Sequence, residues 1–227
     1  MTDKAEFLES IRHRTRTGQY KPTHAPDVAW TRKEGEPRES PPIEDPPARF
    51  LEELDALGGH GKRVESLEKA REYVLSVARE RGAESLVRWD VEELEELGVD
   101  APLEEAGVEV VVWRDLEDPE GFKEVTARAD IGLSSAEWAI ADTGSLVLTS
   151  GPGKARSVTL LPPTYVAIVP ADKVLRTVPE AIEKYAGAGD LPANVVFHTG
   201  PSRSGDIEME IFVGMHGPGD VHVVLVG

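Results

Sequence analysis

Three short polar segments in the second half of the chain carry the side chains best suited to chemistry. They are residues 134–145, 199–206 and 214–220. Carboxylates and imidazoles exchange protons with a substrate, and carboxylates also attack electrophilic carbon atoms. Both residue types occur in these segments. We therefore assign the catalytic roles to Glu137, Asp142 and His216.

The same segments supply candidates for binding an anion. Glycine-rich turns at the carboxyl ends of parallel strands direct backbone N–H groups at anionic ligands. Arg203 and its neighbours follow the apolar run at residues 195–198, which suits that role. The alternative is that Gly, Pro, Ser and Asp only form turns, but three such segments together favour a site. The candidate ligand-binding residues are Thr143, Gly144, Ser145, Gly200, Ser202, Arg203, Ser204, Asp206 and Gly217.

Familiar catalytic motifs are matched only in part. The phosphate-loop motif needs a hydroxyl after its lysine, and Ala155 follows Lys154. Residues 142–145 match the aspartic-protease signature, but those enzymes are all-β and use two carboxylates. The histidines do not have metal-ligand spacing: we interpret His60 as a surface residue and His198 and His222 as core residues. We predict no metal site.

Composition excludes several functions. The chain has 227 residues, a net charge of −17 and no cysteine. Disulfides, thiolate metal sites and cysteine-held iron–sulfur clusters are thereby excluded from this chain. The negative charge argues against nucleic acid and anionic membranes as partners. There is no signal-peptide pattern and no long apolar run, so we expect a cytoplasmic protein without a membrane span.

Two domains are expected along the chain. Residues 1–47 combine a short helix at 3–17 with a proline-rich extended arm, whereas residues 48–227 have regular periodicity. Predicted helices cover residues 50–57, 67–81, 90–97, 154–161 and 179–186; predicted strands cover residues 85–89, 108–113, 145–148, 165–169, 194–199 and 221–226. This alternation predicts an α/β fold with a mostly parallel sheet and flanking helices. Acidic residues concentrate in residues 61–130, where 20 face 10 basic ones, and indicate a solvated or partner-facing surface.

The three polar segments also resemble a known family. Residues 136–148, AEWAIADTGSLVL, are similar to the A-x-x-x-I-A-E-T-G-T-L-V segment of the lactate-utilization protein C family, the LUD domain. Residues 199–208, TGPSRSGDIE, resemble its T-G-P-S-R-T-A-D-I-E segment, and residues 214–218, GMHGP, resemble its G-V-H-G-P segment. The resemblance covers about residues 60–227. Here Asp142 replaces the usual Glu, and Ser145 and Ser204 replace Thr.

The resemblance implies a fold and a function. The fold would be NagB/RpiA/CoA-transferase-like. The protein would be a component of an L-lactate oxidation system, together with two other lactate-utilization proteins that carry the iron–sulfur centres. It would bind a small anionic substrate or a partner's cofactor and hold no redox cofactor of its own. Two alternatives stay open: an enzyme resembling CoA transferases or sugar-phosphate isomerases that uses a carboxylate, and a pure assembly subunit that could form a homo-oligomer.

Overall fold

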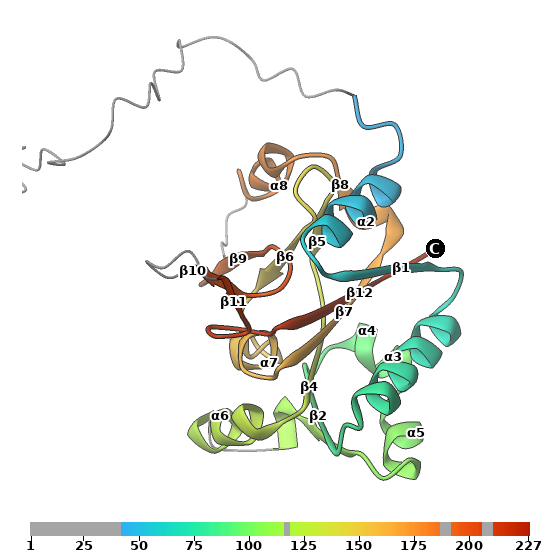
Figure 1. The fold of residues 1–227 in the computed structure, drawn as a ribbon, viewed down its shortest axis with the longest axis vertical. Helices are drawn as coiled ribbons and strands as arrows, with labels where there is room; N and C mark the ends of the chain where they lie inside the picture. Colours follow the sequence, from blue (N-terminus) through green and yellow to red (C-terminus); the bar gives the residue numbers. More distant parts are fainter. Residues whose placement is uncertain (1–41, 116–118, 187–191, 206–210) are drawn as a thin grey trace, which may run out of the picture. The chain divides into compact units, whose positions relative to one another are not determined.

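The computed structural model describes residues 42–115, 119–186, 192–205 and 211–227 (Figure 1). The helix expected at residues 3–17 and most of the proline-rich arm lie outside these ranges. Helix α2 (Pro46–Ala56) is the first described element, so Pro46 and Pro47 begin a helix instead of ending the arm. Proline suits the first helical turn because its missing N–H would have no partner there. The Asp45 side chain caps α2 by accepting a hydrogen bond from the Ala48 amide at 3.1 Å.

The main sheet has six strands in the order β1–β12–β7–β4–β2–β3, and every neighbouring pair is parallel. Their bounds are β1 (His60–Val64), β2 (Ser85–Arg88), β3 (Glu109–Val112), β4 (Ile131–Ser135), β7 (Thr164–Pro170) and β12 (Asp220–Val226). Residues 221–225 of β12 are all buried, as expected for a central strand with helices on both faces. The predicted α/β fold with a mostly parallel sheet is confirmed.

A second, smaller sheet has the order β8–β5–β6–β9. Its strands are β5 (Trp138–Ile140), β6 (Ser145–Thr149), β8 (Val174–Leu175) and β9 (Val195–His198); β10 (Arg203–Gly205) and β11 (Ile211–Val213) form a separate antiparallel pair. β6 is antiparallel to both β5 and β9. The strands predicted at residues 145–148 and 194–199 therefore form, but they lie in this second sheet and not in the parallel one. The short turn between β5 and β6 permits only an antiparallel hairpin.

Helices cover both faces of the main sheet. They are α3 (Leu67–Arg81), α4 (Glu92–Leu97), α5 (Asp100–Glu105), α6 (Pro119–Arg128) and α7 (Arg156–Leu160), with short 3₁₀ helices η1 (Trp113–Asp115) and η2 (Ala171–Lys173). Helix α8 (Val178–Tyr185) packs on β5 and β8 of the second sheet instead. The predicted helix at residues 67–81 is confirmed, and Gly82 ends it in the left-handed conformation with φ 61°. The helix predicted at residues 90–97 begins slightly later: Val91 is the N-cap of α4, and Asp90 pairs with Arg114. No helix in the described ranges is long and apolar enough to cross a bilayer.

Two carboxylates of the acidic segment form ion pairs with a buried arginine. Arg88, at the end of β2, is completely buried. Its Nε lies 2.8 Å from Asp100 Oδ1, and its guanidinium also lies 2.9 Å from Glu95 Oε1. A buried guanidinium is tolerated only when it is paired in this way. Glu95 and Asp100 therefore fasten α4 and α5 to the sheet, a role beyond the solvated surface expected from sequence.

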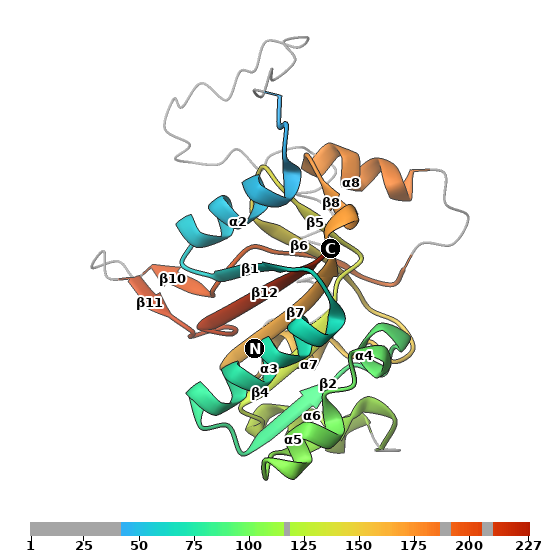
Figure 2. The ribbon, with the colours of Figure 1, turned by 90° about the vertical axis from the view of Figure 1, so that its right-hand side faces the viewer.

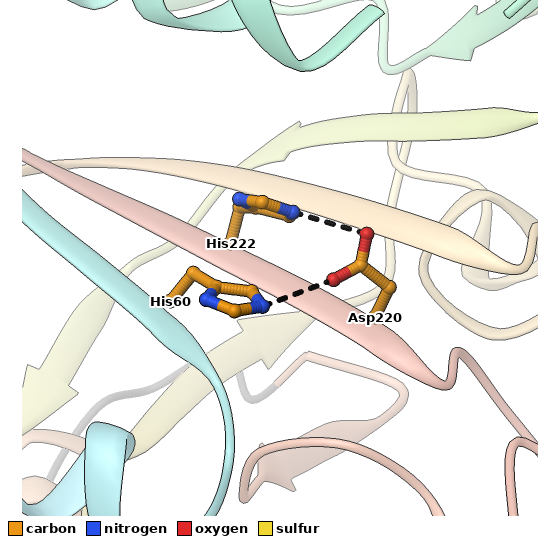
Figure 3. A group of neighbouring side chains, drawn as sticks. All are labelled: His60, Asp220 and His222. Carbon is orange, nitrogen blue, oxygen red and sulfur yellow. Dashed lines mark hydrogen bonds and ion pairs between the residues drawn. The ribbon is translucent and has the colours of Figure 1, made fainter. Parts of the chain in front are cut away.

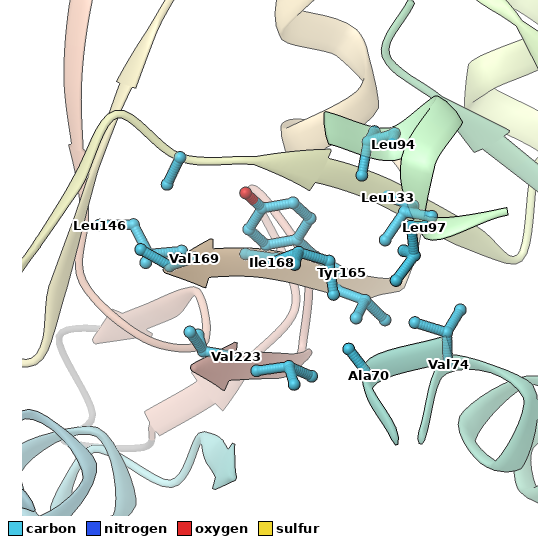
Figure 4. Close-up of a cluster of buried hydrophobic side chains, with 14 of the residues drawn as sticks. Ala70, Val74, Leu94, Leu97, Leu133, Leu146, Tyr165, Ile168, Val169 and Val223 are labelled. Carbon is cyan, nitrogen blue, oxygen red and sulfur yellow. The ribbon is translucent and has the colours of Figure 1, made fainter. Parts of the chain in front are cut away.

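The core lies between the helices and the main sheet. Helix α3 lies in front of this sheet in Figure 2. Its buried residues Ala70 and Val74 belong to the same core cluster as the α4 residues Leu94 and Leu97 (Figure 4). Helix α7 packs on β4 at Gly132, where an added Cβ would lie 2.0 Å from the Val158 carbonyl oxygen. This glycine is what permits the close approach of α7.

Substituting Gly132 by alanine therefore tests the packing of α7 on β4. We expect Gly132→Ala to lower the free energy of unfolding by about 2–3 kcal/mol, because the new methyl group must displace backbone. Urea denaturation measures the change. Gly151→Ala is the control: Gly151 is exposed and its added Cβ meets nothing within 4 Å, so we expect a change within about 0.5 kcal/mol. Equal effects of the two substitutions would contradict the packing argument.

Candidate functional site

The order in which successive strands are added to the main sheet reverses between the neighbouring strands β2 and β4. From β2 the chain continues to β3 on one side, and from β4 it continues toward β7 on the other. In open α/β sheets, ligands bind at such a switch point, beyond the carboxyl ends of the strands. Here the Asp90 amide donates to the Gly153 carbonyl at 2.9 Å, and Trp89 Nε1 donates to the Ala155 carbonyl at 2.8 Å. These bonds hold Lys154 at the switch point, with its Nζ 5.8 Å from the centre of the Trp89 ring.

Glu137 lies at the same edge, between the end of β4 and the start of β5. Its Oε1 accepts hydrogen bonds from Lys154 Nζ at 2.5 Å and from Thr149 Oγ1 at 2.9 Å. Burial by itself would raise the pKa of Glu137, but these two bonds outweigh it, so the pKa lies below its usual value. Glu137 is thus an ionised carboxylate at neutral pH. It suits a nucleophile or a hydrogen-bond acceptor better than a general base.

A small cavity of about 240 Å³ opens at the same edge of the sheet, at Ala136, the residue before Glu137; Glu137, Thr149 and Lys154 do not line it. It lies at the carboxyl ends of β4, β7 and β12, and its lining residues are Leu67, Glu93, Glu96, Ser135, Ala136, Ile168, Pro170, Lys173 and Val226. Lys173 is near enough to help lower the pKa of Glu137. The volume is below the ~300–1,000 Å³ of pockets for drug-sized ligands, so it suits a small metabolite. We call Glu137, Thr149, Lys154, Lys173 and this cavity the Glu137 site.

Other predicted site residues gather at the end of α2 instead. Gly144, in the turn between β5 and β6, has φ +60°, and its added Cβ would lie 2.7 Å from the Leu54 amide nitrogen. Ser145 Oγ lies 2.7 Å from Thr199 Oγ1, which ties this turn to β9. Gly200 would place a Cβ 3.0 Å from Leu57 Cβ. These contacts show that the turn and Gly200 both pack against the end of α2.

The second and third polar segments are also joined directly. The Ser202 amide donates to the Pro218 carbonyl at 2.8 Å, and the Ser202 carbonyl accepts from the Gly214 amide at 2.9 Å. Arg203 donates to the Leu57 carbonyl at the end of α2, and Ser204 lies opposite Phe212 in the β10–β11 pair. The Ser202 amide is therefore already bonded within the protein. Any anion at this cluster would have to bind other groups.

The structure thus does not bring all of the predicted site residues together. Glu137 and Asp142 lie at opposite ends of β5, and the Asp142 amide donates to the Arg176 carbonyl at 3.0 Å. His216 is exposed in the third segment, and Asp206 lies outside the described residues. The cluster at the end of α2 comprises Thr143, Gly144, Ser145, Gly200, Ser202, Arg203 and Gly217. Its ligand-binding role stays a prediction.

Three residues of the Glu137 site were missed by the sequence analysis. Lys154 was considered only within a rejected phosphate-loop match. Its neighbour Gly153 has φ +73°, and an added Cβ would lie 2.1 Å from the Asp90 carbonyl oxygen. That glycine is the local signal of a loop pressed against the sheet edge. No local sequence pattern marks Thr149 or Lys173 as a site residue. The β5–β6 hairpin brings Thr149 to Glu137, and the turn after β7 brings Lys173 near it.

His198 is a half-buried titratable group beside the main sheet, and its Nδ1 is shielded from solvent. Its ring centre lies 5.0 Å from that of Tyr165, whose hydroxyl is 2.7 Å from Ser134 Oγ. Burial lowers the pKa of His198 to about 4. Its Nδ1 has no hydrogen-bond partner in the described part of the chain, and neither does Thr143 Oγ1. His198 is thus neutral at pH 7, and among the residues that the structure describes the hydrogen bonding of its Nδ1 is incomplete.

These features define an α/β protein with a candidate small-molecule site at the carboxyl edge of a parallel sheet. The sequence matches the model of the LUD domain over residues 47–226, and the chain belongs to this family. It is 38% identical to lactate utilization protein C of Halalkalibacterium halodurans over 160 residues, which are 69% of this chain and 67% of that one. The same protein of Shouchella clausii is 36% identical over 172 residues, 74% and 72% of the two chains. The family resemblance predicted from the three segments is confirmed.

A solved structure has the same fold. It is a DUF162 family protein from Deinococcus radiodurans, with a TM-score of 0.58 and 19% sequence identity. The similarity covers 82% of this chain and 100% of that one. At this identity it supports the fold alone.

Burial of His198 predicts a pH-dependent stability. The folded pKa of about 4 lies below the ordinary 6.5, so the unfolded chain binds more protons between these values. Stability is therefore complete above pH 6.5 and falls as the pH drops toward 4, by about 2 kcal/mol at pH 5. Urea unfolding at pH 7 and pH 5 measures this loss. We expect it to shrink in His198→Gln and to persist in the exposed control His216→Gln; an equal loss in all three proteins would contradict the assignment.

Proposed function

We propose that this protein is a component of a lactate utilization system and binds a small 2-hydroxy acid at the Glu137 site. Two observations support the proposal. The curated relatives described above are named lactate utilization protein C. The Glu137 site combines an ionised carboxylate, two lysines and a cavity of about 240 Å³ at the edge where α/β proteins bind ligands.

The proposed ligand matches the chemistry of the site group by group. Lys154 and Lys173 would bind the ligand's carboxylate through charge-assisted hydrogen bonds. The ionised Glu137 would accept a hydrogen bond from the 2-hydroxyl group. Apolar lining side chains such as Ile168 would contact a methyl group. Glu93, which also lines the cavity, would disfavour ligands with more than one negative charge.

Electron transfer would depend on partner chains. Oxidation of lactate to pyruvate removes two electrons, and this chain has no cysteine to hold an iron–sulfur cluster. We therefore assign the redox centres to two other lactate-utilization proteins. The role of this chain would be to hold the hydroxy acid for oxidation within that assembly.

Ligand binding tests the proposed site. We expect isothermal titration calorimetry to detect L-lactate binding that weakens at least tenfold in Glu137→Gln and in Lys173→Ala. Each change removes a charge-assisted contact, and a tenfold loss corresponds to about 1.4 kcal/mol. Lys123→Ala is the matched control, because Lys123 is an exposed lysine on α6. Binding of succinate as tight as that of lactate, or unchanged lactate binding in Glu137→Gln, would contradict the assignment of this site.

The proposed role in lactate utilization has a separate test. Deleting the gene should abolish growth on L-lactate, and the tagged protein should retain the two partner proteins in a pull-down. Normal lactate oxidation after deletion would exclude the role even if the isolated protein binds lactate. Failure of the Glu137→Gln variant to restore growth, with partners still retained, would separate ligand binding from assembly alone.

One observation favours a second candidate, acyl transfer by Glu137. An ionised, half-buried carboxylate can attack a thioester, so that a mixed anhydride forms on Glu137 and the CoA thiolate leaves. Mass spectrometry after incubation with acyl-CoA compounds would detect the covalent adduct, which Glu137→Gln cannot form. The lowered pKa of Glu137 argues against sugar-phosphate isomerisation, because that reaction needs a general base.

A further inference from the structure

A second group of chemically active side chains lies at the opposite, amino edge of the main sheet. It comprises His60 on β1 and Asp220 and His222 on β12 (Figure 3). His60 and His222 are register partners in the parallel β1–β12 pair, so their side chains leave the sheet on the same face. Asp220 precedes His222 by two residues and shares that face, because strand side chains alternate. The sheet itself therefore places the three groups together.

The distances within this group are those of a ligand set. His60 Nε2 lies 3.4 Å from Asp220 Oδ1, and His222 Nε2 lies 3.1 Å from Asp220 Oδ2. One ligand atom from each residue lies within 4.8 Å of those of the other two. Tetrahedral zinc with bonds of about 2.0–2.1 Å separates its ligand atoms by about 3.3 Å. A small rotation of His60, whose side chain is 54% exposed, would complete that geometry.

Neighbouring residues orient two of the three groups. Tyr73 of α3 places its hydroxyl 2.9 Å from His222 Nδ1. Asp220 Oδ2 lies 2.7 Å from Arg81 Nε and accepts from Thr164 Oγ1 at 3.3 Å. Outer hydrogen bonds of this kind fix the tautomer and orientation of metal ligands. They also direct Oδ1, the other carboxylate oxygen, toward His60 (Figure 3).

We propose that His60, Asp220 and His222 bind a divalent transition-metal ion, with Zn²⁺ the best match. Two imidazole nitrogens and one carboxylate oxygen form a donor set that zinc prefers, and magnesium or calcium would require oxygen ligands throughout. Three protein ligands leave the fourth zinc position for water or a ligand from solvent. The exposed His60 places that position at the surface.

Tyr73 makes the exchange between a metal-free and a metal-bound state possible. Without metal, the His222 Nε2–H group can donate to Asp220 while the Tyr73 hydroxyl donates to Nδ1. With metal, the lone pair on Nε2 binds the ion and the proton resides on Nδ1, which then donates to the Tyr73 oxygen. A tyrosine hydroxyl serves both arrangements because it is donor and acceptor. Arg81 retains its contact with Oδ2 in both states, since the metal needs only Oδ1.

Titration of the metal-depleted protein with Zn²⁺ tests the proposal. We expect calorimetry to show one site per chain with a dissociation constant of micromolar or below, and we expect Zn²⁺ to raise the melting temperature. His60→Ala should weaken binding at least tenfold, and Tyr73→Phe should weaken it about 10- to 100-fold through the lost outer hydrogen bond. His216→Ala is the matched control, since His216 is an exposed histidine outside the group.

Two results would overturn the metal site. One is the absence of Zn²⁺ binding to the wild-type protein; the other is Zn²⁺ binding that His60→Ala leaves unchanged. His60→Gln provides a second variant in case the alanine substitution disturbs β1, and circular dichroism checks that each variant is folded. Because the group lies at the opposite edge from the Glu137 site, L-lactate binding should be the same in His60→Ala and wild type. The two proposals can therefore fail independently.

Discussion

The parallel alignment of the six main strands determines where chemistry can occur in this protein. In a parallel sheet every strand begins at one edge and ends at the other, and the chain returns over a face between strands. Glu137 follows the end of β4, so it lies at the carboxyl edge, where Lys154 also comes to lie. His60 and Asp220 begin their strands, so they lie at the amino edge. The two candidate sites are separated by the construction of the sheet.

The parts of the fold that could be predicted from sequence are those with local causes. Both ends of helix α3 are marked by capping residues in the sequence. Ser66 caps its start by accepting a hydrogen bond from the Lys69 amide, and Gly82 ends it in the left-handed conformation. The strand at residues 145–148 is equally visible as an apolar run. The local sequence does not reveal which strands pair with it, because strand pairing depends on contacts with distant residues. Its antiparallel pairing with β5 and β9 in the second sheet could not be predicted for that reason.

In the Glu137 site, too, local features could be predicted and contacts between distant residues could not. Glu137 was identified from its residue type and its position in the polar segment 134–145. Its partners were not, since Thr149 reaches it through the β5–β6 hairpin and Lys154 through a loop pressed against β2. The pairing of β1 with β12 likewise joins His60 to His222 from near the two ends of the described chain. No local pattern around either histidine reveals the other.

Within the segments that carry the family resemblance, some residues are explained by packing and others are not. Gly144 and Gly200 have positive φ angles and lie against α2 with no room for a side chain, so packing alone requires glycine there. The Ser202 backbone joins two loops through its own hydrogen bonds. Much of the resemblance therefore encodes how the second sheet attaches to α2. Glu137 differs from these residues, because its two hydrogen bonds keep it ionised despite burial, an arrangement that packing does not require.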